Sequence, residues 1–251
     1  MNLFRVRGIQ LAVHFSFFLL LAFAAQEGWQ DDGWVGALMG STMLVAFFTC
    51  VVLHELGHSF TAMHFGIGVR RILLMPIGGM AEMDDIPRQP VREGLITLAG
   101  PAVNFVIAGA LWLGLTLAHA ANDDEAGYSV AAFASLLLLW NLVMGIFNLL
   151  PAFPMDGGRI LRALLALKMP YMLATTWAVN IGKTISGVGV ILALWFHVPM
   201  LALLFAFIFF AGAAEHRMVK RREIEDAHWR AVLVRACGAA PSAEEPPVLT
   251  Q

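Results

Sequence analysis

The strongest constraint on the fold is a series of apolar runs, most of which reach the roughly 20 residues that a helix needs to cross a bilayer. Of the 251 residues, 59% are hydrophobic and 14% are charged. This balance is too apolar for a soluble domain of this length. The runs cover residues 9–25, 34–65, 94–120, 129–150, 172–196 and 198–214. The sequence therefore predicts an all-α polytopic membrane protein with about six transmembrane helices.

The charges are segregated between alternate connecting segments. Of the 16 lysines and arginines, only Lys183 falls within a predicted span. All the others lie before the first span, between the second and third, between the fourth and fifth, or after the sixth. The opposite segments carry only acidic charges, at positions 27, 31, 32 and 123–125. The positive-inside rule assigns the basic side to the cytoplasm. We therefore expect an integral protein of a bacterial or archaeal cell membrane, with both termini cytoplasmic.

Three ionisable residues, His54, Glu55 and His58, lie inside the second apolar run. Such groups are costly in a spanning segment and indicate function. On a helix, side chains four residues apart share a face, so the two imidazoles can bind one zinc ion. The adjacent carboxylate can take a proton from the attacking water. The pattern can also arise by chance, but its position on a membrane helix makes coincidence a weaker explanation.

A third ligand is needed, because catalytic zinc usually has three protein ligands and one open position. Asp156 is the best candidate. Pro151 and Pro154 break the fourth span at its cytoplasmic end, and Gly157 and Gly158 follow the aspartate. Irregular backbone at this depth is tolerated where protein or a wet cavity covers it. Taken alone, the segment is more typical of a turn with a solvated aspartate. The paired histidines on the same side of the membrane favour a metal ligand.

The chain resembles the site-2 protease family of intramembrane zinc metalloproteases. The motifs that carry the resemblance are His54-Glu-Leu-Gly-His58, Pro76-Ile-Gly-Gly79, Ala99-Gly-Pro101 with Asn104, and Asn148 through Pro151 to Asp156-Gly-Gly-Arg159. Their order and spacing fit over nearly the whole chain. The resemblance implies that His54, His58 and Asp156 bind one zinc ion per chain. It also implies that Glu55 is the catalytic base and that Asn148 helps to hold the substrate carbonyl or its oxyanion.

The resemblance further implies a substrate and a setting. Family members cut membrane-embedded helices of regulatory proteins, often anti-sigma factors or membrane-bound transcription factors. We expect a transmembrane substrate in the lipid bilayer and no nucleic acid, and a regulatory membrane partner is compatible with this interpretation. Many relatives carry PDZ or CBS domains, for which the outer loop and tail here are too short.

An alternative function is a zinc-binding membrane transporter or sensor. It would use the same three ligands but would not need Glu55. A catalytically idle scaffold would be expected to have lost Glu55 or a ligand.

Further parts of the chain also have predicted roles. Residues 70–83 predict a short membrane-associated β-hairpin-like or re-entrant element whose edge could receive an unwound substrate; a simple loop is the alternative. Asn104 either hydrogen-bonds the histidine motif or packs helices together. Residues 1–215 are expected to form a six-span core. Residues 216–251 are expected to form a cytoplasmic charged helix followed by a disordered proline-rich tail.

Overall fold

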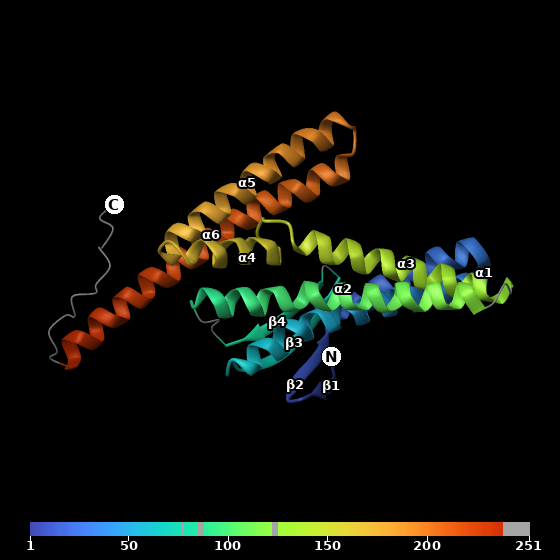
Figure 1. The fold of residues 1–251 in the computed structure, drawn as a ribbon, viewed down its shortest axis with the longest axis horizontal. Coiled ribbons are helices and arrows are strands. Elements are labelled where there is room, and N and C mark those ends of the chain that lie inside the picture. The colour runs from blue at the N-terminus through green and yellow to red at the C-terminus, as the bar shows by residue number, and fades with distance from the viewer. Residues whose placement is uncertain (77, 85–87, 122–124, 238–251) are drawn as a thin grey trace.

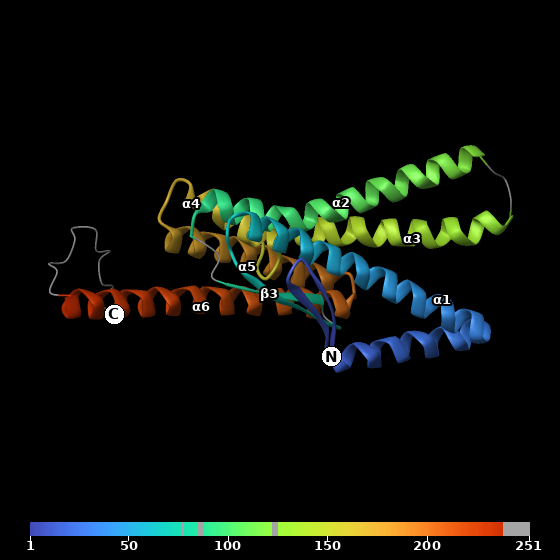
Figure 2. The same ribbon diagram turned by 90° about the horizontal axis from the view of Figure 1, so that it is seen from below.

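The computed structural model describes residues 1–76, 78–84, 88–121 and 125–237. Its helices are α1 (Phe15–His64), α2 (Pro90–Ala121), α3 (Glu125–Asn148), α4 (Asp156–Ala166), α5 (Tyr171–Trp195) and α6 (Pro199–Cys237). Its strands are β1 (Asn2–Val6), β2 (Ile9–Val13), β3 (Val69–Met75) and β4 (Gly78–Met83). The second arm of α1 runs beside α2 and α3, and α4 connects this group to the α5–α6 hairpin (Figures 1 and 2).

Five helices are long and apolar enough to cross a membrane within the described part of the chain: α1, α2, α3, α5 and α6. The longest, α1, is two helices joined at a sharp bend. Asp32 and Gly33 leave helical geometry, and Gly33 has a φ of 55° that favours glycine. The two arms then fold back on each other, as Figure 2 shows at the right of the view. The Phe17 and Phe48 rings meet across the arms with centroids 4.9 Å apart.

Close packing at the bend depends on small residues. A Cβ atom at Gly28 would overlap the backbone carbonyl of Gly36 in the opposite arm. A Cβ atom at Gly40 would lie 2.8 Å from the carbonyl oxygen of Ala24. The glycines therefore allow the two backbones to approach within the distance that the hairpin requires.

The N-terminal segment forms strands, which corrects the predicted start of the first span at residue 9. Ile9–Val13 is strand β2, and the helix begins at Phe15 after the His14 side chain accepts a hydrogen bond from the Ser16 backbone. Hydropathy alone cannot distinguish a short buried strand from the first turns of a helix. The expectation of an all-α fold with one small β element was therefore too simple.

The four strands form one sheet in the order β1-β2-β3-β4. Strands β2 and β3 are parallel, with Gln10 opposite Arg71 and Val13 opposite Leu74. Strands β3 and β4 are antiparallel, so the predicted hairpin over residues 70–83 is present as two β-strands. Its association with the membrane stays a prediction.

The sheet packs against the end of α1. Ile9, Leu11 and Ile72 are buried against Leu56, which lies within the histidine motif. This contact holds β4 beside the same part of α1. Farther along the chain, α6 continues without interruption from the last apolar run to Cys237, so the predicted charged helix is present. The predicted disordered tail at 238–251 and the acidic positions 123 and 124 lie outside the described residues.

Candidate metal centre

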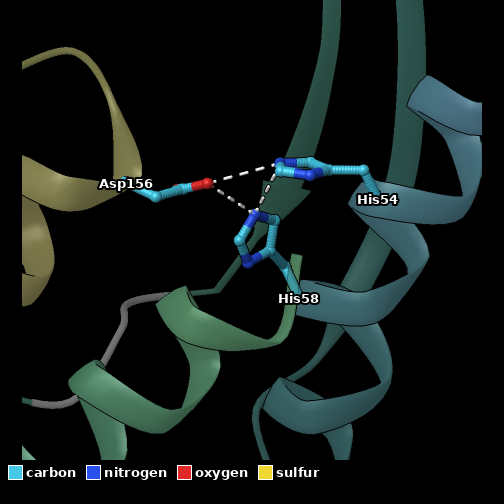
Figure 3. A group of neighbouring side chains, drawn as sticks. All are labelled: His54, His58 and Asp156. Carbon is cyan, nitrogen blue, oxygen red and sulfur yellow. Dashed lines mark hydrogen bonds and ion pairs between the residues drawn. The ribbon is translucent and has the colours of Figure 1, made fainter. Parts of the chain in front are cut away.

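His54, His58 and Asp156 meet in a buried cluster formed by two helices. The histidines lie one turn apart on α1, and Asp156 is the first residue of α4. The two Nε2 atoms are 3.1 Å apart, and Asp156 Oδ2 lies 3.3 Å from each of them (Figure 3). The histidines are only 5% and 8% exposed. The fold thus brings Asp156 to two histidines that lie about 100 positions earlier in the sequence.

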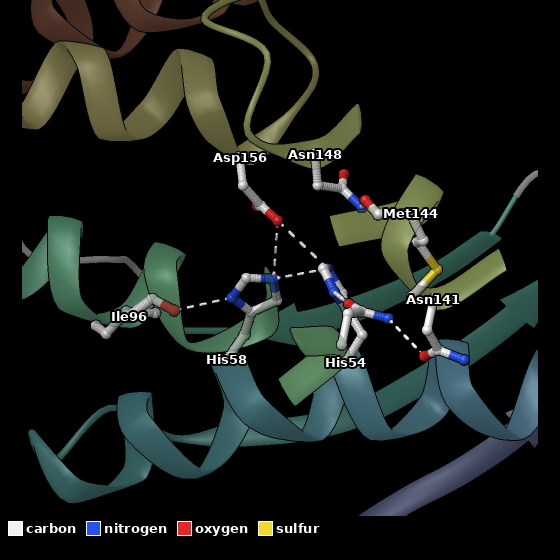
Figure 4. A network of polar contacts seen from close by, with 8 residues as sticks. His54, His58, Ile96, Asn141, Met144, Asn148 and Asp156 are labelled. Atoms are coloured by element: carbon white, nitrogen blue, oxygen red, sulfur yellow. Dashed lines mark hydrogen bonds and ion pairs between the residues drawn. The ribbon is translucent and has the colours of Figure 1, made fainter. Parts of the chain in front are cut away.

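The outer nitrogen of each imidazole is held by a hydrogen bond. His58 Nδ1 lies 2.8 Å from the Ile96 carbonyl oxygen, which can only accept, so Nδ1 carries the proton. His54 Nδ1 lies 2.6 Å from Oδ1 of Asn104. In neutral imidazoles with this tautomer, both Nε2 atoms have a free lone pair, and Figure 4 shows their contacts with Asp156. Hydrogen bonds of this kind fix the tautomer of metal-binding histidines.

The cluster fits a divalent cation. The Asp156 Oδ2 atom is buried and has no hydrogen-bond donor among the described residues. When both imidazoles are neutral, two nitrogen lone pairs and a carboxylate oxygen face one another, an arrangement that a cation between them would stabilise. In a tetrahedral zinc site with bonds of about 2.0–2.1 Å, neighbouring ligand atoms are about 3.3 Å apart. The three observed separations match this spacing, and the donor set of two imidazoles and one carboxylate is typical of catalytic zinc.

The glycines after Asp156 explain how α4 presents this residue. A Cβ atom at Gly157 would overlap the carbonyl oxygens of Leu149 and Leu150. A Cβ atom at Gly158 would lie 2.7 Å from the backbone nitrogen of Phe153. The connection from α3 can therefore fold tightly against the first turn of α4.

Glu55 lies beside the cluster and against the sheet. It directly follows His54 on α1. Its side chain also packs on Gly79 of β4, where a Cβ atom would be 2.6 Å from Glu55 Cγ. The structure thus brings Glu55 together with the three predicted ligands.

Asn148 has a different environment. It is the last residue of α3, and its Nδ2 donates to the Met144 carbonyl oxygen at 3.0 Å (Figure 4). This bond lies within its own helix and does not connect Asn148 to the cluster. Its catalytic role stays a prediction.

Two other asparagines are connected to the cluster. Asn104 of α2 bonds His54, which supports the hydrogen-bonding alternative for this residue, and Nδ2 of Asn104 donates to Asn141 of α3 at 3.1 Å. Sequence analysis missed Asn141. The available signal was an amide within an apolar run, since such groups usually bond across membrane helices.

Gly100 of α2 lines the cluster from another side. A Cβ atom at this position would lie 2.8 Å from His54 Nε2 and closer still to His58 Nε2. Only glycine therefore allows α2 to approach the two imidazoles this closely.

Known proteins share both the sequence and the fold. The family described as peptidase family M50 matches residues 42–120 and 114–194. The zinc metalloprotease MJ0392 of Methanocaldococcus jannaschii is 38% identical over 219 residues, which cover 87% of this chain and 61% of that protein. The putative zinc metalloprotease sll0528 of Synechocystis is 34% identical, over 62% of this chain and 42% of that protein. This chain thus spans about half of these relatives' length.

A solved structure supports the same relationship. The site-2 protease from Methanocaldococcus jannaschii superposes with a TM-score of 0.60 at 36% identity, covering 86% of this chain and 94% of that one. The five apolar helices agree with such a membrane protein. The chain is therefore an integral membrane protein that belongs to peptidase family M50, with the fold of a site-2 protease.

Proposed function

We propose that this chain is an intramembrane zinc metalloprotease that hydrolyses a peptide bond within or near the transmembrane segment of a membrane protein. The observation that carries this proposal is the buried convergence of His54, His58 and Asp156, with Glu55 directly after His54 on the same helix. A transporter or sensor would account for the three ligands. It would not account for an acid that directly follows the first of them and packs on a strand.

In this proposal, His54, His58 and Asp156 bind the zinc ion. When bound, zinc supplies Lewis acidity that activates a water molecule and polarises the scissile carbonyl. Glu55 accepts a proton from the water molecule while the water oxygen attacks the carbonyl carbon. Glu55 then returns this proton to the amide nitrogen, so the C–N bond breaks as the amine leaves. Asn148 Nδ2 has a second N–H beyond the one that bonds Met144, and this N–H is proposed to stabilise the oxyanion.

The substrate must be extended before it can be cut, because a helix buries its peptide bonds in its own hydrogen bonds. Strand β4 is at the edge of the sheet, so one side of it has no neighbouring strand among the described elements. Gly79 on this strand touches Glu55. We propose that an unwound substrate segment pairs with the free edge of β4, in the way that many peptides extend a sheet. The scissile bond would then lie beside Glu55.

The membrane arrangement is part of the same proposal. The antiparallel arms of α1 support two separate crossings, which would give six spans in total. The acidic Asp31 and Asp32 lie at the bend, whereas the basic residues other than Lys183 lie towards the other ends of the spans or in the segments that connect those ends. The positive-inside rule then places both termini and the metal centre near the cytoplasmic side. Residues 1–215 would form the membrane core, and residues 216–251 would lie in the cytoplasm.

The proposed substrate class is taken from the resemblance to the site-2 protease family. A single-span regulatory protein, such as an anti-sigma factor or a membrane-bound transcription factor, has one helix that can reach the β4 edge. Its cleavage would release a cytoplasmic fragment. One relative is the stage IV sporulation protein FB of Bacillus subtilis. Its name is compatible with a regulatory role, but it does not identify the substrate of this chain.

The decisive test compares Glu55→Gln with the parent chain. Each is co-expressed with single-span candidate substrates, and full-length substrate and bound zinc are measured. Glu55→Gln should keep one zinc per chain and leave the substrate uncut, because glutamine cannot accept the proton. Glu27→Gln, the same change at an exposed position of α1, serves as the matched control and should cut normally. Cleavage by Glu55→Gln would refute the assignment of the base, and a parent chain that binds no zinc would refute the metal site.

A further inference from the structure

We propose that Asn141, which does not touch the metal cluster, is a positioning residue that sets the tautomer of His54 through Asn104. This inference rests on the proposed function, since it takes His54 to be a zinc ligand. Asn141 is 1% exposed and Asn104 is fully buried, so water does not compete for their amides. The three side chains come from α3, α2 and α1.

The direction of every hydrogen bond in this relay is set by one backbone carbonyl. The Leu137 carbonyl oxygen can only accept, and it lies 2.8 Å from Asn141, so Nδ2 of Asn141 must face it. The same Nδ2 approaches Cys50 Sγ at 3.3 Å. The other amide atom of Asn141, Oδ1, is thereby directed towards Asn104.

The orientation of Asn141 then determines that of Asn104. Because Oδ1 of Asn141 accepts, Asn104 must present Nδ2 to it, at 3.1 Å. This leaves Oδ1 of Asn104 facing His54 Nδ1, at 2.6 Å. The His54 Nδ1 atom must therefore carry the proton, and Nε2 is left with a free lone pair.

A reversed amide at Asn104 would have the opposite effect. It would present an N–H to His54 Nδ1, which would then accept, and the imidazole proton would move to Nε2. That proton would point into the space between His58 and Asp156 and would oppose cation binding. His58 needs no such relay, because its Nδ1 bonds the Ile96 backbone carbonyl directly. The difference between the two histidines explains why α3 carries a buried amide at this position.

The alternative is that Asn141 only holds helices together. The two roles predict different effects when Asn141 is replaced by an apolar residue of similar size. A packing role predicts altered stability and unaltered zinc affinity. A positioning role predicts weaker zinc binding, by about 10- to 100-fold as for other residues that orient metal ligands.

The test measures zinc affinity of the purified full chain in detergent by competition with a chromophoric chelator. Cobalt(II) absorption spectra report the ligand geometry independently of activity. Asn141→Leu should bind zinc about 10- to 100-fold more weakly and alter the cobalt spectrum. Thr175→Val is the matched control: Thr175 is also fully buried in a span, but its hydroxyl bonds only the Tyr171 carbonyl of its own helix. This variant should bind zinc like the parent.

A rescue variant separates positioning from packing. Both oxygens of a carboxylate accept hydrogen bonds, so an aspartate at position 104 can bond His54 Nδ1 without being oriented by position 141. The double variant Asn104→Asp/Asn141→Leu should therefore recover most of the affinity that Asn141→Leu loses. If Asn141→Leu does not fold, Asn141→Ala is used in its place in both tests, because it removes the same amide.

The outcomes distinguish this inference from the proposal on which it rests. Parental zinc affinity in folded Asn141→Leu would overturn the positioning role, as would a double variant that stays as weak as Asn141→Leu. His54→Ala is measured in parallel. If it kept full zinc affinity, the ligand assignment itself would be wrong, whatever Asn141 does.

Discussion

Gly79 of β4 packs directly on the side chain of Glu55, with an added Cβ atom predicted to lie only 2.6 Å from Glu55 Cγ. The two residues belong to elements that are separated in sequence but held together by the packing of the sheet on α1. The proposed base and the proposed substrate-binding edge are therefore in contact. A substitution at Gly79 should therefore alter the position of the Glu55 side chain.

Gly79→Ala should displace Glu55 and reduce cleavage. A shift of about 1 Å in a reacting group can cost on the order of 100-fold in rate. Bound zinc should be unchanged, because Gly79 does not face the three ligands. The measurement is kcat/KM together with zinc per chain. Gly187→Ala, at a position of α5 with no neighbouring atom within 4 Å of an added Cβ, should behave like the parent. Normal cleavage by folded Gly79→Ala would show that this contact does not matter for the reaction.

Gly100→Ala should abolish zinc binding instead. Its Cβ atom would press on the Nε2 atoms of both His54 and His58, where the metal has to bind. Zinc content and cleavage should fall together. Gly109→Ala lies on the same helix, where an added Cβ meets nothing within 4 Å, and should retain both. Full zinc occupancy in Gly100→Ala would contradict the placement of the site.

Arg162→Met should destabilise the fold. Arg162 is 5% exposed and donates from Nε and Nη2 to Glu93 Oε1 and from Nη1 to Glu215 Oε1, which ties α4 to α2 and α6. Removing one partner of a buried ion pair costs about 3–5 kcal/mol, because the remaining charge is left without compensation. The Tm in detergent should fall accordingly. Arg221→Met breaks an exposed pair with Glu225 and should change the Tm little. Equal effects of the two variants would argue against a structural role for the buried cluster.

The six-span arrangement can be tested with single cysteines. In a background without Cys50 and Cys237, Asp32→Cys should react with a membrane-impermeant maleimide added to intact cells, because the bend of α1 is proposed to face outwards. Lys220→Cys, on the charged part of α6, should react only after lysis. The reverse pattern would mean that the orientation is inverted, and reaction of both on one side would contradict the six-span arrangement.

Local features of the site follow directly from sequence because they depend on helical periodicity. His54 and His58 share a face whatever the rest of the chain does, since they are four residues apart on a helix. Asp156 is predicted from the proline and glycine residues around it and from its expected position on the same side of the membrane as the paired histidines. The structure places its carboxylate 3.3 Å from both histidines.

Other features depend on partners that are distant in sequence. Ile9–Val13 has the hydropathy of a helix start, and its pairing with β3 makes it a strand instead. The bend at Gly33 becomes a hairpin through the contacts of the two arms.

Sequence by itself determined that the chain belongs in a bilayer and that two imidazoles share one helical face, because hydropathy and a period of 3.6 residues act locally. Only the tertiary structure decided which glycines let helices approach them, and that Asn141 is linked to His54 through Asn104. The physical reason is that a hydrogen bond or a close contact is specified by two surfaces at once, and the chain brings those surfaces together only when it folds.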